Sequence, residues 1–199
     1  MSIRRSRSLR AAAVGLLAAL VAVPASAEAK TYAHNDPRGD MHEVSTSPWP
    51  PAPEQVSGDI LRMRAWHTKS RIRVRLVFAE LDPVPNSLIA TNYRFFTNEG
   101  QGRGVQIIAG PRNRQGSGYM YRFSDGARVR CAMHRAFDYT QNVVVFGFSR
   151  RCISNPRWVR ISASAKTDGL DQPTYADNAQ RTGLEHSIHL NYSPRIRRG

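Results

Sequence analysis

The fold of this chain is decided by residues 58–81, which read GDILRMRAWHTKSRIRVRLVFAEL. Apolar and basic side chains alternate along both halves of this stretch, and the polar segment Thr68-Lys69-Ser70 separates the halves. Because successive side chains of a β-strand point to opposite faces, a period of two places the apolar set on a buried face. That set is Leu61, Met63, Ala65, Ile72, Val74, Leu76 and Phe78. The stretch therefore predicts a β-hairpin with one apolar face and one arginine-rich face.

Segments of similar character recur through the rest of the chain and are separated by turn residues such as Asp125-Gly126. They cover residues 88–98, 105–109, 119–123, 128–133, 143–148 and 158–165. No helical period continues for three turns. Roughly eight or nine short strands at this spacing are typical of an antiparallel sandwich. The sequence therefore predicts an all-β, single-domain antiparallel β-sandwich of the jelly-roll type, with its core at residues 57–166.

The two flanks of this core lack a regular period. Four prolines in residues 47–53 remove hydrogen-bond donors and fix φ, so the leader at residues 28–56 is predicted to be irregular and extended. Trp49 is a candidate anchor for it. The tail at residues 167–199 is predicted to be irregular too, either packed on the sandwich or trailing from it.

The N-terminus has the layout of a secretory signal peptide. A basic start with four arginines is followed by the apolar residues 11–23 and by the small-residue box Ala25-Ser26-Ala27. The apolar segment is too short for a membrane span. Cleavage after residue 27 would leave 172 of the 199 residues, with no further membrane segment. We therefore expect a secreted or cell-wall-associated protein, and a monomer.

The chain contains two cysteines, Cys131 and Cys152. In an exported protein an even number of cysteines favours a disulfide. The absence of a CxxC motif speaks against a redox or metal role for them.

The chain is strongly basic, with a formal net charge of +14 that falls to +10 once the four arginines of the signal peptide are removed. Such an excess favours acidic partners, for example cell-wall polyanions, anionic glycans or nucleic acid. The alternative is that the charge serves solubility alone. Nucleic acid is the least expected of these partners in an exported chain.

Three short motifs resemble those of a set of secreted actinobacterial β-sandwich proteins. They are the Asp-Pro-x-Gly-Asp turn at residues 36–40, the Gly-Asp-Ile start of the hairpin at 58–60, and Cys-Ile-x-Asn-Pro-x-Trp-Val-Arg at 152–160. The layout is similar to the DOMON-like sandwich and to family 9 carbohydrate-binding modules. The resemblance implies an extracellular binding or structural domain, and relatives of that kind bind sugars, sometimes haem, and some hold structural calcium.

Four aspartates form the first candidate site. Asp36 and Asp40 flank the Pro-x-Gly turn, Asp59 opens the hairpin, and Asp177 lies near the end of the chain. Calcium binds six to eight oxygen atoms from carboxylates, carbonyls and water. Since the leader and the tail of a sandwich can meet, these residues are candidate ligands of one calcium ion. The alternative is that Asp36 caps its own turn and Asp40 is solvated. No other cofactor is implied.

The arginine-rich side of the hairpin is the second candidate site. Guanidinium groups present paired donors to phosphate, sulfate or carboxylate groups, and aromatic rings can stack on sugars. The candidate ligand-binding residues are Arg62, Arg64, Trp66, Arg73, Arg75, Tyr119 and Tyr121. The alternative is a solvated face whose charge blocks aggregation.

Catalytic motifs are missing from the sequence. There is no GxSxG elbow, P-loop or pair of catalytic glutamates, and His186 and His189 stand three apart rather than four as in HExxH. The sequence therefore predicts a secreted non-catalytic binding domain for glycans or anionic cell-wall polymers. A small secreted hydrolase and a purely structural or inhibitory exported protein remain the alternatives.

Overall fold

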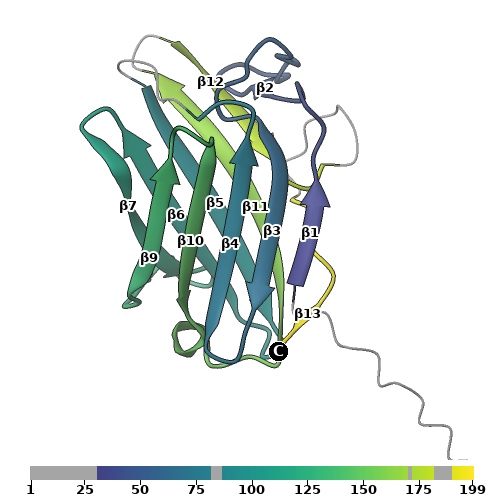
Figure 1. Ribbon diagram of the computed structural model, residues 1–199, viewed down its shortest axis with the longest axis vertical. Coiled ribbons are helices and arrows are strands. Elements are labelled where there is room, and N and C mark those ends of the chain that lie inside the picture. Colours follow the sequence, from purple (N-terminus) through teal and green to yellow (C-terminus); the bar gives the residue numbers. More distant parts are fainter. Residues whose placement is uncertain (1–30, 82–86, 170–171, 182–189) are drawn as a thin grey trace, which may run out of the picture.

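The computed structural model describes residues 31–81, 87–169, 172–181 and 190–199. The predicted signal peptide lies outside these residues. Within them the chain forms two antiparallel β-sheets that face each other, which confirms the predicted β-sandwich (Figure 1). No helix of the described ranges is long and apolar enough to cross a membrane.

The first sheet has five strands, in the order β1-β3-β4-β10-β9. Their bounds are β1 Thr31–Asn35, β3 Ile60–His67, β4 Arg71–Phe78, β9 Met133–Asp138 and β10 Val143–Ser149. The predicted hairpin is β3 and β4, at the centre of this sheet, and its turn is closed by the Thr68 N–H, which donates to the Arg71 carbonyl (3.0 Å). Ile72, Val74 and Leu76 are fully buried. The apolar side chains that alternate along β4 in the sequence are therefore the ones that are buried in the structure.

Leu61 departs from the predicted pattern. A β-bulge lies between Ile60 and Arg62 in the pairing of β3 with β4, so Ile60 takes the fully buried position and Leu61 is only half-buried. A bulge adds a residue to one strand and shifts the facing of its side chains. The arginines after the bulge keep their predicted outward direction.

The second sheet has the order β2-β12-β11-β5-β6-β7-β8, and β13 pairs with β11. Its strands are β2 His42–Glu43, β5 Ser87–Thr97, β6 Gly102–Gly110, β7 Asn113–Arg122, β8 Arg128–Val129, β11 Trp158–Gly169, β12 Gln172–Asn178 and β13 Ile196–Arg197. Aromatic rings of the two sheets meet in the core: Tyr93 and Phe146 lie 4.1 Å apart between ring centroids, and Phe95 and Phe148 lie 5.2 Å apart.

The structure differs from the sequence prediction in both flanks. The leader supplies β1, which pairs with β3, and β2, which pairs with β12, while the tail supplies β12 and β13. Residues 43–50 fold back on themselves, since the Glu43 N–H donates to the Pro50 carbonyl (3.0 Å). β2 and β13 have two residues each and β1 lies at a sheet edge, so partner strands rather than local periodicity decide their pairing.

The prediction for residues 128–133 was also wrong in detail. Only Arg128–Val129 pairs as β8, and a new strand, β9, begins at Met133, the last residue of the predicted segment, and runs to Asp138. Cys131 lies in the break between the two strands, next to the one-turn 3-10 helix Arg150–Ile153 that carries Cys152.

A disulfide joins Cys131 to Cys152, with 5.6 Å between the Cα atoms. It ties the segment between β8 and β9 to the connection between β10 and β11. Replacing both cysteines with alanine should lower the free energy of unfolding by roughly 3 kcal/mol, because the open chain gains conformational entropy. Urea unfolding of the variant and of the oxidised wild type measures this difference; equal midpoints would contradict it.

Candidate functional site

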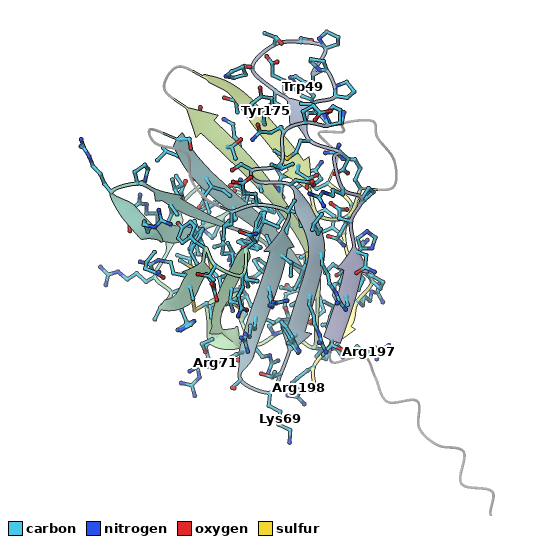
Figure 2. The ribbon with its side chains drawn as sticks, turned by 45° about the horizontal axis from the view of Figure 1, so that its top comes forward. Trp49, Lys69, Arg71, Tyr175, Arg197 and Arg198 are labelled. Atoms are coloured by element: carbon cyan, nitrogen blue, oxygen red, sulfur yellow. A yellow bond between two sulfur atoms is a disulfide. The ribbon has the colours of Figure 1, made fainter. Side chains whose placement is uncertain are left out.

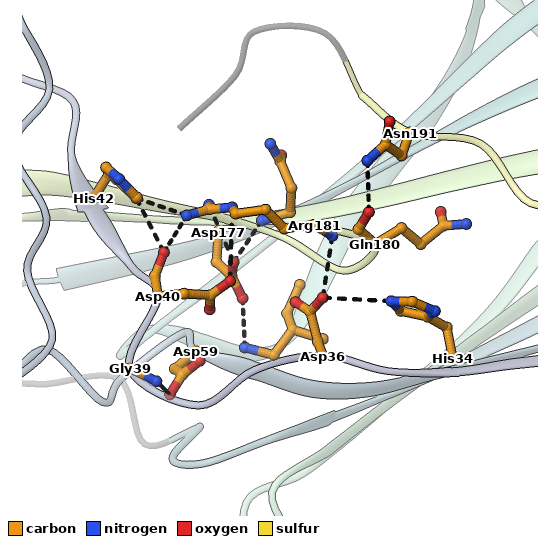
Figure 3. Close-up of polar contacts among 12 residues, drawn as sticks. His34, Asp36, Gly39, Asp40, His42, Asp59, Asp177, Gln180, Arg181 and Asn191 are labelled. Carbon is orange, nitrogen blue, oxygen red and sulfur yellow. Dashed lines mark hydrogen bonds and ion pairs between the residues drawn. The ribbon is translucent and has the colours of Figure 1, made fainter. Parts of the chain in front are cut away.

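The four aspartates that the sequence singled out approach one another in the structure, where they are buried beside Arg181 (Figure 3). One carboxylate oxygen each from Asp36, Asp40 and Asp177 lies within 4.8 Å of the other two. Asp59 is next to this group, and its charge acts on Asp40 and Asp177. The exposed fraction is 8% for Asp36, 1% for Asp40 and zero for the other two. We call these four residues the carboxylate cluster.

Local backbone bonds fix the position of each carboxylate. Asp36 directly follows β1, and its N–H donates to the Leu61 carbonyl (3.0 Å). Gly39 has φ +74°, a left-handed conformation that glycine adopts readily, and its N–H donates to Asp59 Oδ2 (2.9 Å). Asp177, in β12, accepts the N–H of Ile60 on Oδ2 (2.7 Å). The turn, the start of β3 and β12 are thus held together.

Arg181 is the cation of the cluster, and sequence reasoning missed it. Its backbone N–H donates to Asp36 Oδ1 (3.2 Å), and its side chain donates to Asp177 Oδ1 (3.3 Å) and to the Asp40 carbonyl. Its Nε lies 3.6 Å from Asp40 Oδ2. The spacing of four from Asp177 was the only available signal, and it has little meaning outside a helix.

Several oxygens of the carboxylate cluster accept no hydrogen bond from the described residues. They are Asp36 Oδ2, both side-chain oxygens of Asp40, and Asp59 Oδ1. Buried polar atoms normally have a partner, and those that lack one call for an explanation such as an ion. These oxygens therefore point to a ligand.

The pKa values of the carboxylate cluster are raised, as expected for buried carboxyl groups. Burial, followed by the charges of Asp177 and Asp40, raises the pKa of Asp36 to about 9. Burial, followed by the charge of Asp40, raises the pKa of Asp177 to about 7. Burial also raises the pKa values of Asp40 and Asp59, against the opposing effects of Arg181 and of the Gly39 N–H.

Shifted carboxyl groups are also found in active sites. A catalytic acid or base must reach its substrate within hydrogen-bond distance, however. The members of the carboxylate cluster are at most 8% exposed. A substrate could not approach them without movement of the surrounding chain. The arrangement therefore favours ion binding over catalysis.

The second candidate site lies on the outer face of β3 and β4. Arg62, Arg64, Trp66, Arg73 and Arg75 share this surface, which we call the arginine–tryptophan face; they line a hollow of about 290 Å³ together with Val77. The guanidinium groups of Arg64 and Arg73 lie 5.0 and 5.4 Å from the centre of the Trp66 ring. Within the described residues, no ion pair joins the arginines of this face to a carboxylate.

A second hollow of about 450 Å³ adjoins the arginine–tryptophan face across β10. Trp66, Arg71, Arg73 and His134 are among its lining residues, and Gly147 of β10 lies between the strands of Arg73 and His134. A Cβ atom at Gly147 would lie 2.9 Å from the Ile72 carbonyl oxygen, so glycine allows β10 to pair closely with β4 here. The basic surface therefore continues sideways over the first sheet.

Tyr119 and Tyr121 do not belong to this face. They lie on β7, on the outer side of the second sheet, where Tyr119 donates to Gln106 (2.9 Å). There they begin a row of neighbouring rings, spaced 5.0 to 5.9 Å between centroids, that continues through Phe123, Phe96 and Tyr192. The predicted ligand-binding set is therefore divided between the two outer faces of the sandwich.

The end of the sandwich that carries the β3–β4 turn is basic as well. Figure 2 shows Lys69, Arg71, Arg197 and Arg198 at this end. A hollow of about 420 Å³ is lined there by Arg150, Asn155, Arg157, Trp158, Arg195, Arg197 and Arg198. Sequence reasoning missed this site because its residues come from the connection between β10 and β11, the start of β11 and the tail, which meet only in the folded chain.

Three of the four histidines of the described chain have structural contacts, and the fourth, His134, lines the second hollow. The Arg150 Nε–H donates to His67 Nε2 (2.9 Å), so the Nδ1–H of His67 donates to the Ile196 carbonyl (2.9 Å). Burial lowers the pKa of His67. His34 lies 3.8 Å from Asp36, and His42 lies 2.7 Å from Arg181. His186 and His189 lie outside the described residues.

The fold and the two sites define the chain as a two-sheet antiparallel β-sandwich with a carboxylate cluster and a basic outer face. No protein-family model, curated protein or solved structure matches it. The likeness to DOMON-like sandwiches therefore stays a prediction, and the functional argument depends on the geometry of this chain.

Proposed function

We propose that this protein is an exported, non-catalytic binding domain whose arginine–tryptophan face holds an anionic glycan or another anionic cell-wall polymer. The observation that carries the proposal is the group of outward-facing arginines around Trp66, which no carboxylate of the described chain neutralises.

The position of Trp66 favours a charged ligand over a neutral sugar. Because Arg64 and Arg73 lie near its ring, Trp66 orients two guanidinium groups instead of offering a bare stacking surface. Oriented guanidinium groups keep their N–H donors available for the oxygens of sulfate, phosphate or carboxylate. Basic hollows on the adjacent surface and at the β3–β4 end extend the reach of such an interaction. An extended polymer matches this layout better than a small molecule.

The arginines of this face lower the stability of the sheet. Arg64 and Arg75 are directly opposite each other in the pairing of β3 with β4. Like charges in opposite positions destabilise a sheet by about 0.2–1 kcal/mol. A ligand that supplies negative charge would remove this repulsion, which is consistent with a binding role.

We therefore expect the double variant Arg64→Thr/Arg75→Thr to bind an anionic polymer less tightly and to unfold at equal or higher urea concentration. The measurement is fluorescence anisotropy with a labelled heparin octasaccharide between 50 and 300 mM salt. Affinity should fall about tenfold, and the slope of log K against log salt should decrease by about two, since two charge contacts are lost. Uncharged dextran should not compete.

The matched control is Arg112→Thr/Arg130→Thr, which removes the same charge outside the face. An equal loss of affinity in this control would show that only net charge matters and would contradict the proposal. Binding that is indifferent to salt would contradict it too, and tighter binding of single-stranded DNA than of heparin would move the proposal to nucleic acid.

A further inference from the structure

We propose that the carboxylate cluster binds one calcium ion, with Asp36, Asp40 and Asp177 as ligands and Asp59 as their neighbour, and that this ion fastens the leader and β12 to the start of β3. The inference is independent of the arginine–tryptophan face.

The first argument is the number of available donors. Asp36 Oδ2 and both side-chain oxygens of Asp40 accept no hydrogen bond from the described residues, although Asp40 is only 1% exposed. Together with the Asp177 carboxylate of β12, the two aspartates of the turn present oxygens within 4.8 Å of one another. Asp59 Oδ1 adds a fourth buried oxygen without a hydrogen bond. Carboxylates with open lone pairs, supplemented by water, are the usual ligands of calcium.

The second argument is the balance of charge. Four aspartates surround one buried cationic side chain, Arg181, which donates to Asp177 and lies beside Asp40. The charge of Arg38 also acts on Asp59, but Arg38 is exposed. With all carboxylates ionised the four aspartates and Arg181 together carry a charge of −3, and buried charge of one sign is unfavourable unless it is paired or coordinates a metal. A divalent cation would reduce the charge to −1. Arg181 therefore provides part of the counter-charge and leaves room for an ion to provide the rest.

The third argument concerns the kind of ion. The donors are carboxylate oxygens, which suit hard cations rather than zinc or copper, since those favour nitrogen and sulfur. Magnesium demands a near-ideal octahedron and keeps most of its water, whereas calcium tolerates irregular and bidentate carboxylates. The geometry points to calcium.

Such an ion would connect parts of the chain that are far apart in sequence. Asp36 and Asp40 enclose the turn after β1, and Asp177 belongs to β12, which pairs with β11 and β2. The turn is otherwise held by the Gly39–Asp59 bond and by contacts with Arg181. Calcium should therefore order the leader more than any other part of the sandwich.

The test is calorimetric titration of chelator-treated full-length protein with calcium chloride. We expect one ion per chain with a dissociation constant on the order of 10⁻⁴ M, as in extracellular modules, and at least tenfold weaker binding of magnesium. At 10 mM calcium the melting temperature should rise by about 5–10 °C. Amide hydrogen exchange should slow at residues 36–43 and remain unchanged in β7.

Two variants decide the outcome. Asp40→Asn should weaken calcium binding at least tenfold, whereas Asp138→Asn, the same change at an exposed residue of β9, should bind like the wild type. If circular dichroism shows that Asp40→Asn does not fold, Asp36→Asn takes its place and should also weaken calcium binding at least tenfold. Wild-type protein that gives neither heat nor a melting shift at 10 mM calcium overturns the proposal, as does undiminished binding by the folded variant.

Discussion

Replacing Arg181 with methionine is expected to lower the free energy of unfolding of the calcium-free protein by about 3–5 kcal/mol, because it leaves buried carboxylates without their cation. The guanidinium group contacts the Asp177 carboxylate at 3.3 Å and the Asp40 carboxylate at 3.6 Å, and the side chain is 5% exposed. Methionine keeps most of the length and volume of the side chain, so the change reports on charge and hydrogen bonds more than on packing. Urea unfolding in the presence of EDTA gives the value.

A double-mutant cycle separates this effect from a general loss of packing. Adding Asp40→Asn to Arg181→Met removes one of the unpaired charges, so the double variant should be more stable than the sum of the single changes predicts. The exposed Arg112, replaced in the same way, should change stability by no more than about 0.5 kcal/mol. A loss of less than 1 kcal/mol for Arg181→Met, or strict additivity in the cycle, would show that Arg181 does not neutralise the cluster.

The second large effect is a loss of stability between pH 7 and pH 9 in the presence of EDTA. Asp36 has a pKa of about 9 in the folded protein, mainly because of burial, and about 3.9 in an unfolded chain. The folded state therefore keeps a proton that the unfolded state has released, and stability falls as pH rises until the folded pKa is passed. For one proton the expected slope is about −1.4 kcal/mol per pH unit.

The window from pH 7 to pH 9 separates Asp36 from Asp177 and His67. Asp40 and Asp59, whose pKa values burial also raises, act in the same direction as Asp36. Asp177, with a pKa of about 7, acts in the same direction at lower pH. His67, whose pKa burial lowers, acts in the opposite direction, since its contribution to stability is lost as pH falls through its range. Urea midpoints at pH 7, 8 and 9 measure the slope. Asp36→Asn should flatten it, and a wild-type profile that is flat or rises in this window would contradict the assignment.

Much of the sandwich was determined by local sequence. Alternation along residues 58–81 predicted the hairpin and its buried side, because a strand with one face in the core must repeat with a period of two. Ile72, Val74 and Leu76 are fully buried as expected. The pairing of Cys131 with Cys152 was expected from there being two cysteines in a chain that is predicted to be exported. The sequence also named four aspartates as candidates for one site: the pair that flanks the Pro-x-Gly turn, the one that opens the hairpin, and Asp177 near the end of the chain.

The tertiary structure decided the features that a period-two pattern does not specify, such as the sheet in which a strand lies. Alternation tells which residues share a face of a strand, but not in which sheet the strand lies, so Tyr119 was grouped with Trp66 although the two are on opposite outer faces. The same limit applies to β1 and β12, whose pairing depends on partners far away in the sequence. Arg181 reaches the carboxylate cluster only because β12 brings it beside the leader. Charge compensation in a buried site depends on distances in space, and the sequence does not contain those distances in any local pattern.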